Sequence, residues 1–137
     1  MNILYLVIPI LSWIVSGTIK FLINYFKNGS EALKKVGNGG FPSTHTSVVS
    51  SVTFLILFSE GFTSTFSVSV ALLMIVIIDA TGIRRSLGKH ATIINFMNKD
   101  IKDFNKLREQ QGHNIFEVIG GLMVGAILGY LGSLLIF

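Results

Sequence analysis

The sequence predicts an all-α protein embedded in a membrane, with about four transmembrane helices and an amphipathic helix in a cytoplasmic loop. Half of its 137 residues are apolar and only 13% are charged, which is too apolar for an ordinary soluble domain. A hydrocarbon core of about 30 Å takes roughly 20 helical residues to cross. We therefore expect residues 1–137 to form a single integral membrane domain with four or five crossings at most.

The first apolar stretch covers residues 3–26 and carries no charge before Lys20. It resembles a signal peptide only superficially, because no basic segment precedes it and no small-residue cleavage site ends it. We expect it to be retained as a membrane helix.

Three further stretches supply the remaining helices. Residues 46–62 and 63–78 are short and meet at a turn around Glu60. They could be core helices of a soluble bundle, but the last stretch, residues 118–137, contains no charge at all. A run of that length favours membrane crossing.

Glycines recur every fourth residue in the last stretch, at Gly121, Gly125 and Gly129. This spacing puts them on one helix face, where the lack of side chains lets another helix approach closely. That helix could belong to the same chain or to a second copy, so a homodimer is one expected assembly.

The basic residues are distributed unevenly. Alternate threading of the four stretches puts residues 27–45 and 79–117 on one side of the membrane. Ten of the eleven Lys and Arg residues lie there, and the eleventh, Lys20, is near that end of the first helix. The positive-inside rule makes this side the cytoplasm of a cell or inner membrane, with both termini outside. The net charge of +4 then reflects topology, and we expect no nucleic acid partner.

The longer cytoplasmic loop predicts an amphipathic helix. Apolar residues recur every three or four positions at Ile93, Met97, Ile101, Phe104 and Leu107, with charged residues between them. Such a helix could lie on the inner leaflet, where basic residues favour anionic head groups. It could equally pack over the inner face of the protein itself.

Polar and ionisable groups gather where the helices meet this cytoplasmic face. Such groups are costly at membrane depth, so they indicate function when they occur there. The threading rests on hydropathy and basic charge alone, and it still brings these groups to one face, where we expect a single site. They are Lys20, Lys27, Ser43, Thr44, His45, Asp79, Arg84, Arg85, His113 and Glu117.

This set suits the binding of a phosphate group. Lys and Arg side chains clamp phosphate oxygens, and the first turn of a helix presents free N–H groups to an anion. The start of the second helix at Ser43 and Thr44 is therefore a natural phosphate seat, approached by a loop with glycines at 37, 39 and 40. Asp79 is expected either to pair with an arginine or to cap the third helix.

The histidines suit phosphoryl transfer. His113 and Glu117 are four residues apart and so share a helix face, which lets the carboxylate hold one ring nitrogen and leaves the other free to attack. His45 could give a proton to a leaving oxygen. The chain has no cysteine, and its histidines lie on separate elements without two carboxylate partners. We therefore expect neither a metal nor another cofactor.

Together the motifs resemble the type 2 phosphatidic acid phosphatases and vanadium-dependent haloperoxidases. The first motif of that superfamily is Lys, six residues, Arg-Pro, and Lys20 and Lys27 have its spacing. The second is Pro-Ser-Gly-His, which residues 42–45 match with Thr in place of Gly. The third ends in His, three residues, Asp, which His113 and Glu117 match with Glu in place of Asp.

The arginine of the third motif is displaced. Arg84 and Arg85 lie 29 and 28 positions before His113, whereas Arg108 is one residue too close. The strings Gly-Gly-Phe-Pro-Ser-Thr-His-Thr, Asp-Ala-Thr-Gly-Ile-Arg-Arg and Gly-His-Asn-Ile-Phe-Glu-Val are similar to those of the divergent, small four-helix branch of this superfamily. The resemblance covers most of the chain.

The resemblance implies a metal-independent, acid phosphatase-like enzyme that hydrolyses a lipid phosphate or diphosphate through a phosphohistidine. It makes His113 the nucleophile, Glu117 the group that orients it and His45 the general acid. The phosphate would be held by Lys20, Lys27, Ser43, Thr44, Arg84 and Arg85, with Asp79 in support. One alternative is a non-catalytic protein that binds or transports a lipid phosphate. The other is a structural membrane protein, which would not need two histidines at one face.

Overall fold

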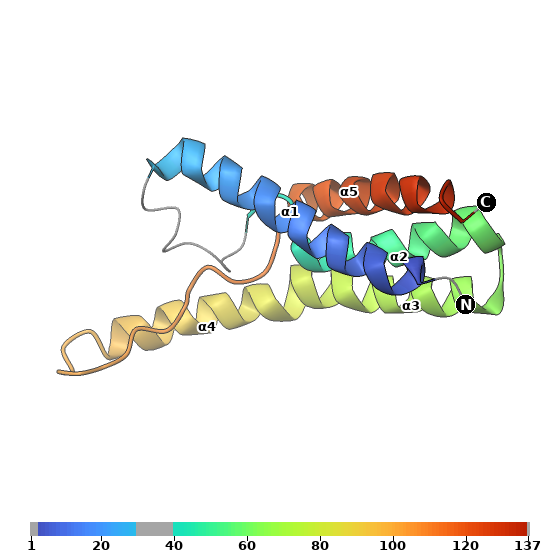
Figure 1. Cartoon of the computed structure of the whole chain (residues 1–137). Helices are drawn as coiled ribbons and strands as arrows, with labels where there is room; N and C mark the ends of the chain where they lie inside the picture. The colour runs from blue at the N-terminus through green and yellow to red at the C-terminus, as the bar shows by residue number, and fades with distance from the viewer. Residues whose placement is uncertain (1–2, 30–39, 137) are drawn as a thin grey trace.

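The computed structural model describes residues 3–29 and 40–136, and in these residues the regular structure is entirely helical, as expected (Figure 1). The helices are α1 (Leu4–Asn28), α2 (Thr44–Glu60), α3 (Ser64–Ile78), a π-helical turn (Asp79–Ile83), α4 (Arg84–Met97) and α5 (Ile115–Ser133).

Side-chain caps set where three of the helices begin. The side chains of Ser43, Thr63 and Asn114 each accept a hydrogen bond from a backbone N–H in the first turn of α2, α3 and α5. Such caps satisfy donors that have no partner within the helix. As a result α2 and α5 begin two and three residues before the apolar stretches that predict them.

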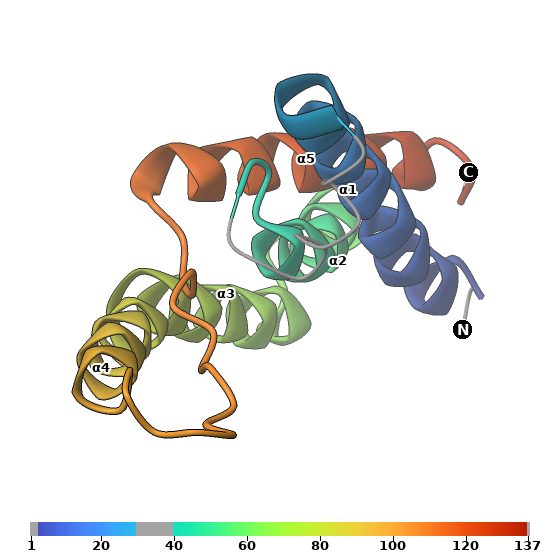
Figure 2. The same ribbon diagram turned by 90° about the vertical axis from the view of Figure 1, so that its left-hand side faces the viewer.

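Helix α2 is the central element of the bundle. It packs against α1, α3 and most extensively α5, and Figure 2 shows it in the middle with these helices around it. Its buried face is largely hydroxylic, and the hydroxyls bond carbonyls one turn back, as Ser47 does to Ser43 (2.9 Å) and Thr53 to Val49 (3.0 Å). The helix therefore satisfies most of its polar side chains internally.

The glycine face of α5 lies directly against α2. A Cβ added at Gly121 would lie 2.6 Å from the carbonyl oxygen of Ser43, and one added at Gly129 would lie 2.7 Å from that of Ser51. Of the two partners that the glycine spacing allowed, the structure shows a helix of the same chain. A homodimer stays a prediction and would need another surface.

Helices α3 and α4 form one continuous rod through the π-turn. The rod, Ser64–Met97, has 34 residues, or about 51 Å at 1.5 Å per residue, so it is much longer than a bilayer core is thick. Its α4 half extends beyond the bundle (Figure 1).

The predicted loop helix is correct only in part. Ile93 and Met97 lie in α4, but the helix ends at Met97, and its continuation to Leu107 is wrong. The buried side chain of Asn95 explains the difference. Its Oδ1 accepts from the N–H of Leu107 (2.8 Å), and its Nδ2 donates to the carbonyl of Leu107 (2.8 Å) and to Glu109 (2.7 Å). Leu107 thus pairs with Asn95 instead of forming helical hydrogen bonds.

In residues 3–29 and 40–136, three helical segments are long and apolar enough to cross a membrane: Leu4–Lys27, Ser64–Met97 and Ile115–Ser133. Helix α2, with 17 residues, is not among them. That α2 crosses the membrane, which would make four spans, stays a prediction. Large apolar side chains such as Leu6, Ile10 and Met123 are well exposed on the outer helices, as lipid contact requires. The first turn of α1 and the last turn of α5 lie at the same end of the bundle (Figure 1).

Candidate functional site

A cavity of about 910 Å³ lies between α1, α2 and the end of α3. Its walls come from α1 and α2 together with Val76 of α3, and residues 108, 110–113 and Arg84 complete its polar end. Of the ten predicted site residues, the ones that line this cavity are Lys20, Thr44, His45, Arg84 and His113.

His113 is buried and held from two sides. Its Nδ1 lies 2.8 Å from Glu117 Oε2, an oxygen that also accepts from the backbone N–H of Asn114 (3.2 Å). The backbone N–H of His113 donates to the carbonyl of Ala80 in the π-turn (2.9 Å). Because a carboxylate only accepts, Nδ1 carries the proton, and the lone pair of a neutral ring is then on Nε2. This is the arrangement that the spacing of His113 and Glu117 predicts.

Burial lowers the pKa of His113 below its ordinary value of 6.5, although the hydrogen bond to Glu117 opposes the shift. The positive charges of Lys20 and Arg84 lower this pKa further. His113 is therefore neutral at pH 7, as a nucleophile must be.

His45 and Arg84 lie beside His113 at the polar end of the cavity. The ring centroids of His45 and His113 are 6.4 Å apart, and Arg84 Nη1 is 3.5 Å from His45 Nε2. The Nε of Arg84 donates to Asp79, so of the two roles expected for Asp79 the structure shows pairing with an arginine. The pair aims the guanidinium toward the histidines.

Ser43 connects two of the motifs instead of lining the cavity. It is fully buried, its hydroxyl caps α2 by accepting from Thr46 N (3.4 Å), and its own N–H donates to the carbonyl of Glu117 (2.8 Å). Ser43 thereby fixes the start of α2 against the first turn of α5, while Thr44 lines the cavity.

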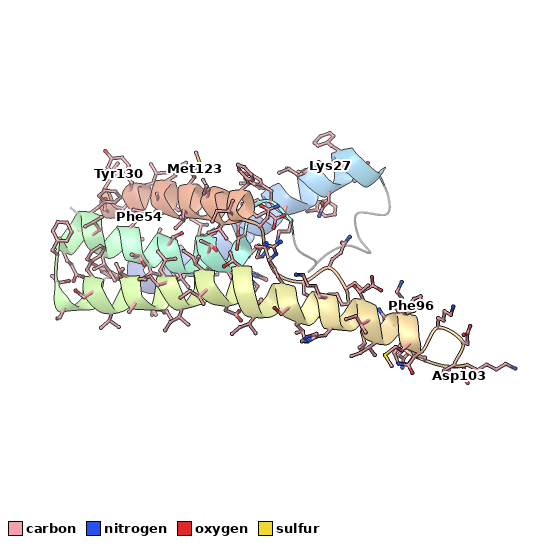
Figure 3. All side chains as sticks on the ribbon, turned by 180° about the vertical axis from the view of Figure 1, so that it is seen from behind. Lys27, Phe54, Phe96, Asp103, Met123 and Tyr130 are labelled. Atoms are coloured by element: carbon pink, nitrogen blue, oxygen red, sulfur yellow. The ribbon has the colours of Figure 1, made fainter. Side chains whose placement is uncertain are left out.

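Two predicted phosphate ligands lie away from the cavity. Lys27 is exposed in the last turn of α1, two turns beyond Lys20, at the far end of the helix in Figure 3. Arg85 is exposed, and its aliphatic part packs on Gly112, where an added Cβ would lie 2.6 Å from Arg85 Cγ. Of the approach-loop glycines, 37 and 39 lie outside the described residues, whereas Gly40 has a φ of 136°, which favours glycine.

Arg108 also lines the cavity, although it is not among the ten predicted site residues. It follows Leu107, whose backbone is bonded on both sides to Asn95, so α4 sets the position of this arginine. The sequence signal was present, since Arg108 precedes His113 by five positions, but it differs by one residue from the spacing of the superfamily.

In the described part of the chain, no cluster of three or more His, Asp or Glu side chains is placed to hold a metal ion.

A family model described as "Divergent PAP2 family" matches residues 1–128, which include every residue of the site. The chain belongs to the divergent PAP2 family. An uncharacterized membrane protein of Bacillus subtilis (strain 168), YuiD, is similar to this chain, with 35% identity over 108 residues. The match covers 66% of this chain and 68% of YuiD, and no solved structure matches the chain.

Membership of the divergent PAP2 family confirms the resemblance drawn from the motif strings, and the match to YuiD supports a membrane location. The structure shows how the residues of the three motifs are arranged in this divergent PAP2 protein. His45 of the second motif and His113 of the third face one cavity, together with Lys20 of the first. Arg84 and Arg108 supply two further cations to it.

Proposed function

We propose that this protein hydrolyses a phosphate monoester or diphosphate on a lipid. The observation that carries the proposal is the geometry of His113. Its ring is buried and neutral, Glu117 holds one nitrogen, and the cavity that it lines contains a second imidazole and three cationic side chains. Phosphatidate, phosphatidylglycerol phosphate and polyprenyl diphosphates all carry the terminal phosphate that such a site would bind.

In the first step, Nε2 of His113 attacks phosphorus and the bond from phosphorus to the lipid oxygen breaks. His45 gives a proton to that oxygen, so the lipid leaves as an alcohol, or as a monophosphate when the substrate is a diphosphate. Lys20, Arg84 and Arg108 neutralise the charge that spreads over the phosphoryl oxygens. The N–H groups in the first turn of α2 add to this stabilisation.

In the second step, a water molecule attacks the phosphohistidine. His45, now neutral, takes a proton from the water, the N–P bond breaks, and its electron pair returns to His113. Glu117 accepts the Nδ1 hydrogen bond throughout, and it keeps the ring in one orientation for both steps.

Arg84 has to change partner during this cycle. A guanidinium only donates hydrogen bonds, so in its 3.5 Å contact with His45 Nε2 that nitrogen is an acceptor and cannot carry the proton for the leaving group. A phosphate in the cavity would attract Arg84 and release His45 Nε2 to be protonated. Asp79 keeps the arginine within reach of both positions.

The direct test is phosphate release by the purified protein from a panel of lipid phosphates. Orthovanadate should inhibit competitively because it adopts the trigonal-bipyramidal geometry of phosphoryl transfer, and EDTA should have little effect. Activity that is lost on chelation and restored by Mg²⁺ would contradict the histidine mechanism. Vanadate binding without release of phosphate from any lipid would instead indicate a non-catalytic binding or transport protein.

We propose further that four helices cross the membrane, with the site in the cytoplasm and both termini outside. The charge distribution supports this orientation, because none of the eleven Lys and Arg residues would then lie on the outer side. The start of α1 and the end of α5 lie at one end of the bundle, which is consistent with an even number of crossings.

The absence of native cysteine makes this topology easy to measure. A cysteine at the exposed position Asp100 should react with an impermeant maleimide only after cells are opened. One at the exposed position Ser64 should react in intact cells, once any outer membrane is permeable to the reagent. The reverse pattern would put the site on the outer face and refute the orientation.

A further inference from the structure

Gly17 has no packing partner, although it lies in the interior of α1. A Cβ added there would meet nothing within 4 Å, whereas each glycine of the face of α5 meets atoms of α2 at less than 3 Å. A glycine inside a helix costs about 1 kcal/mol relative to alanine. No close contact between helices explains that cost at Gly17, so the open space beside it requires another reason.

That space is part of the cavity of the candidate site. Besides Gly17, the lining includes the apolar side chains of Trp13 and Ile14, one turn before it on α1, and of Val48 and Val49 on α2, together with the polar Thr18. Lys20 is three residues further along α1, on the same helix face and about 4.5 Å along the axis, and it begins the cationic end of the cavity. One cavity thus combines a largely apolar part, beside Gly17, with a positively charged part that includes Lys20.

The volume also exceeds what a phosphate group needs. Ligand cavities of about 300–1,000 Å³ hold molecules of drug size, and this one has about 910 Å³. A ligand that matched both ends would carry an anionic group beside Lys20 and an apolar chain beside Gly17. This charge distribution fits a lipid phosphate and does not fit a helix of a second copy, which would leave the cationic end unmatched.

We propose that the space beside Gly17 is a hydrocarbon subsite, which takes the part of the lipid chain next to the phosphate, and that Gly17 keeps this subsite wide enough. The proposal rests on the proposed function, which it deepens by assigning a specificity-determining position. Gly17 then selects for an apolar chain on the phosphate but takes no part in the chemistry.

Replacement of Gly17 by phenylalanine should fill the subsite. We expect the ratio of kcat/KM for dioleoyl phosphatidate to kcat/KM for 4-nitrophenyl phosphate to fall about tenfold or more, because only the lipid loses apolar contact area. Leu11→Phe is the matched control, since Leu11 is on α1 but does not line the cavity, and it should leave the ratio unchanged. An equal loss with both substrates, or no change, would overturn the proposal.

A binding experiment separates this proposal from the proposed function. A phosphatidate analogue with a diazirine in its acyl chain should label α1 near Gly17 in the wild-type protein, and Gly17→Phe should remove that labelling. Labelling elsewhere, or a disulfide between two copies carrying Gly17→Cys, would refute the subsite. If the protein releases no phosphate but is labelled at α1, the proposed function fails and the subsite holds.

Discussion

Replacing His113 by alanine should reduce turnover of both a lipid phosphate and an aryl phosphate by at least about 10⁴-fold. A nucleophile is required whatever group departs, so the loss should not depend on the leaving group. His113 is buried, and its partners Glu117 and Ala80 hold its ring and its backbone. No other imidazole in the described residues has such an arrangement, so none is placed to substitute for it.

His45→Ala should behave differently, because a general acid matters most when the departing oxygen is strongly basic. Formation of the phosphoenzyme from the lipid should fall by about 10²–10⁴-fold, whereas formation from an aryl ester, whose phenolate leaves readily, should fall far less. Single-turnover kinetics are needed, since His45 also activates the water that clears the intermediate. Equal loss of the phosphorylation step with both substrates would show that His45 only positions the phosphate.

The pH dependence gives a second measure of the role of His113. Since burial lowers the pKa of His113 from 6.5, the ring stays neutral through pH 7. With an aryl phosphate, whose departure does not depend on the proton of His45, the rate of phosphoenzyme formation should fall as the pH drops below 6.5 through the lowered pKa of His113 and its ring takes up a proton. Glu117→Gln removes a charge that opposes this shift, so it should move the fall to still lower pH and reduce the plateau rate. An unchanged pH profile in this variant would argue against Glu117 as the orienting partner.

Replacing Gly129 by alanine should destabilise the protein, although alanine is favoured over glycine in a helix by about 1 kcal/mol. The added Cβ would lie 2.7 Å from Ser51 O and 2.8 Å from Leu55 N, which are backbone atoms that cannot move without shifting α2. Overpacking of this kind costs about 1–3 kcal/mol. We expect a lower Tm and also lower activity, because α2 carries His45.

Gly17→Ala is the matched control for this experiment. It makes the same chemical change, but the new Cβ meets nothing within 4 Å, so the helix propensity of alanine is gained without a clash and Tm should rise slightly. Thermal unfolding of both variants in the same detergent measures the difference. A Tm for Gly129→Ala at or above that of the wild type would show that α2 and α5 pack less closely than the structure indicates.

Much of the fold follows from the sequence because hydropathy and membrane thickness constrain it strongly. The apolar stretches predict α1, α2, α3 and α5, and the glycine repeat predicts one close helix contact. The helix starts at Ser43 and Asn114 are set by side-chain capping, which hydropathy does not detect. The end of α4 depends on Asn95 binding a backbone twelve residues away, and no periodicity within the helix encodes that contact.

The site was predictable to the extent that its residues lie in short motifs. Spacing alone pairs His113 with Glu117. It does not distinguish Arg84, which lines the cavity, from its neighbour Arg85, which packs on Gly112, because that depends on the rotation of the helix after the π-turn. Arg108 is not among the predicted site residues for a similar reason, since an irregular segment, held by α4, brings it to the cavity.

The hydroxyl-rich character of α2 has a consequence for the biogenesis of the protein. An insertion machinery evaluates each segment by its own transfer free energy, and 17 residues with seven Ser and Thr side chains provide little driving force alone. A short turn joins α2 to the strongly apolar α3, so we expect the two to enter the bilayer together as a helical hairpin. The Pro-Ser-Thr-His motif at the start of α2 would then reach its final position only after α5 has been synthesised and has covered the hydroxyl groups.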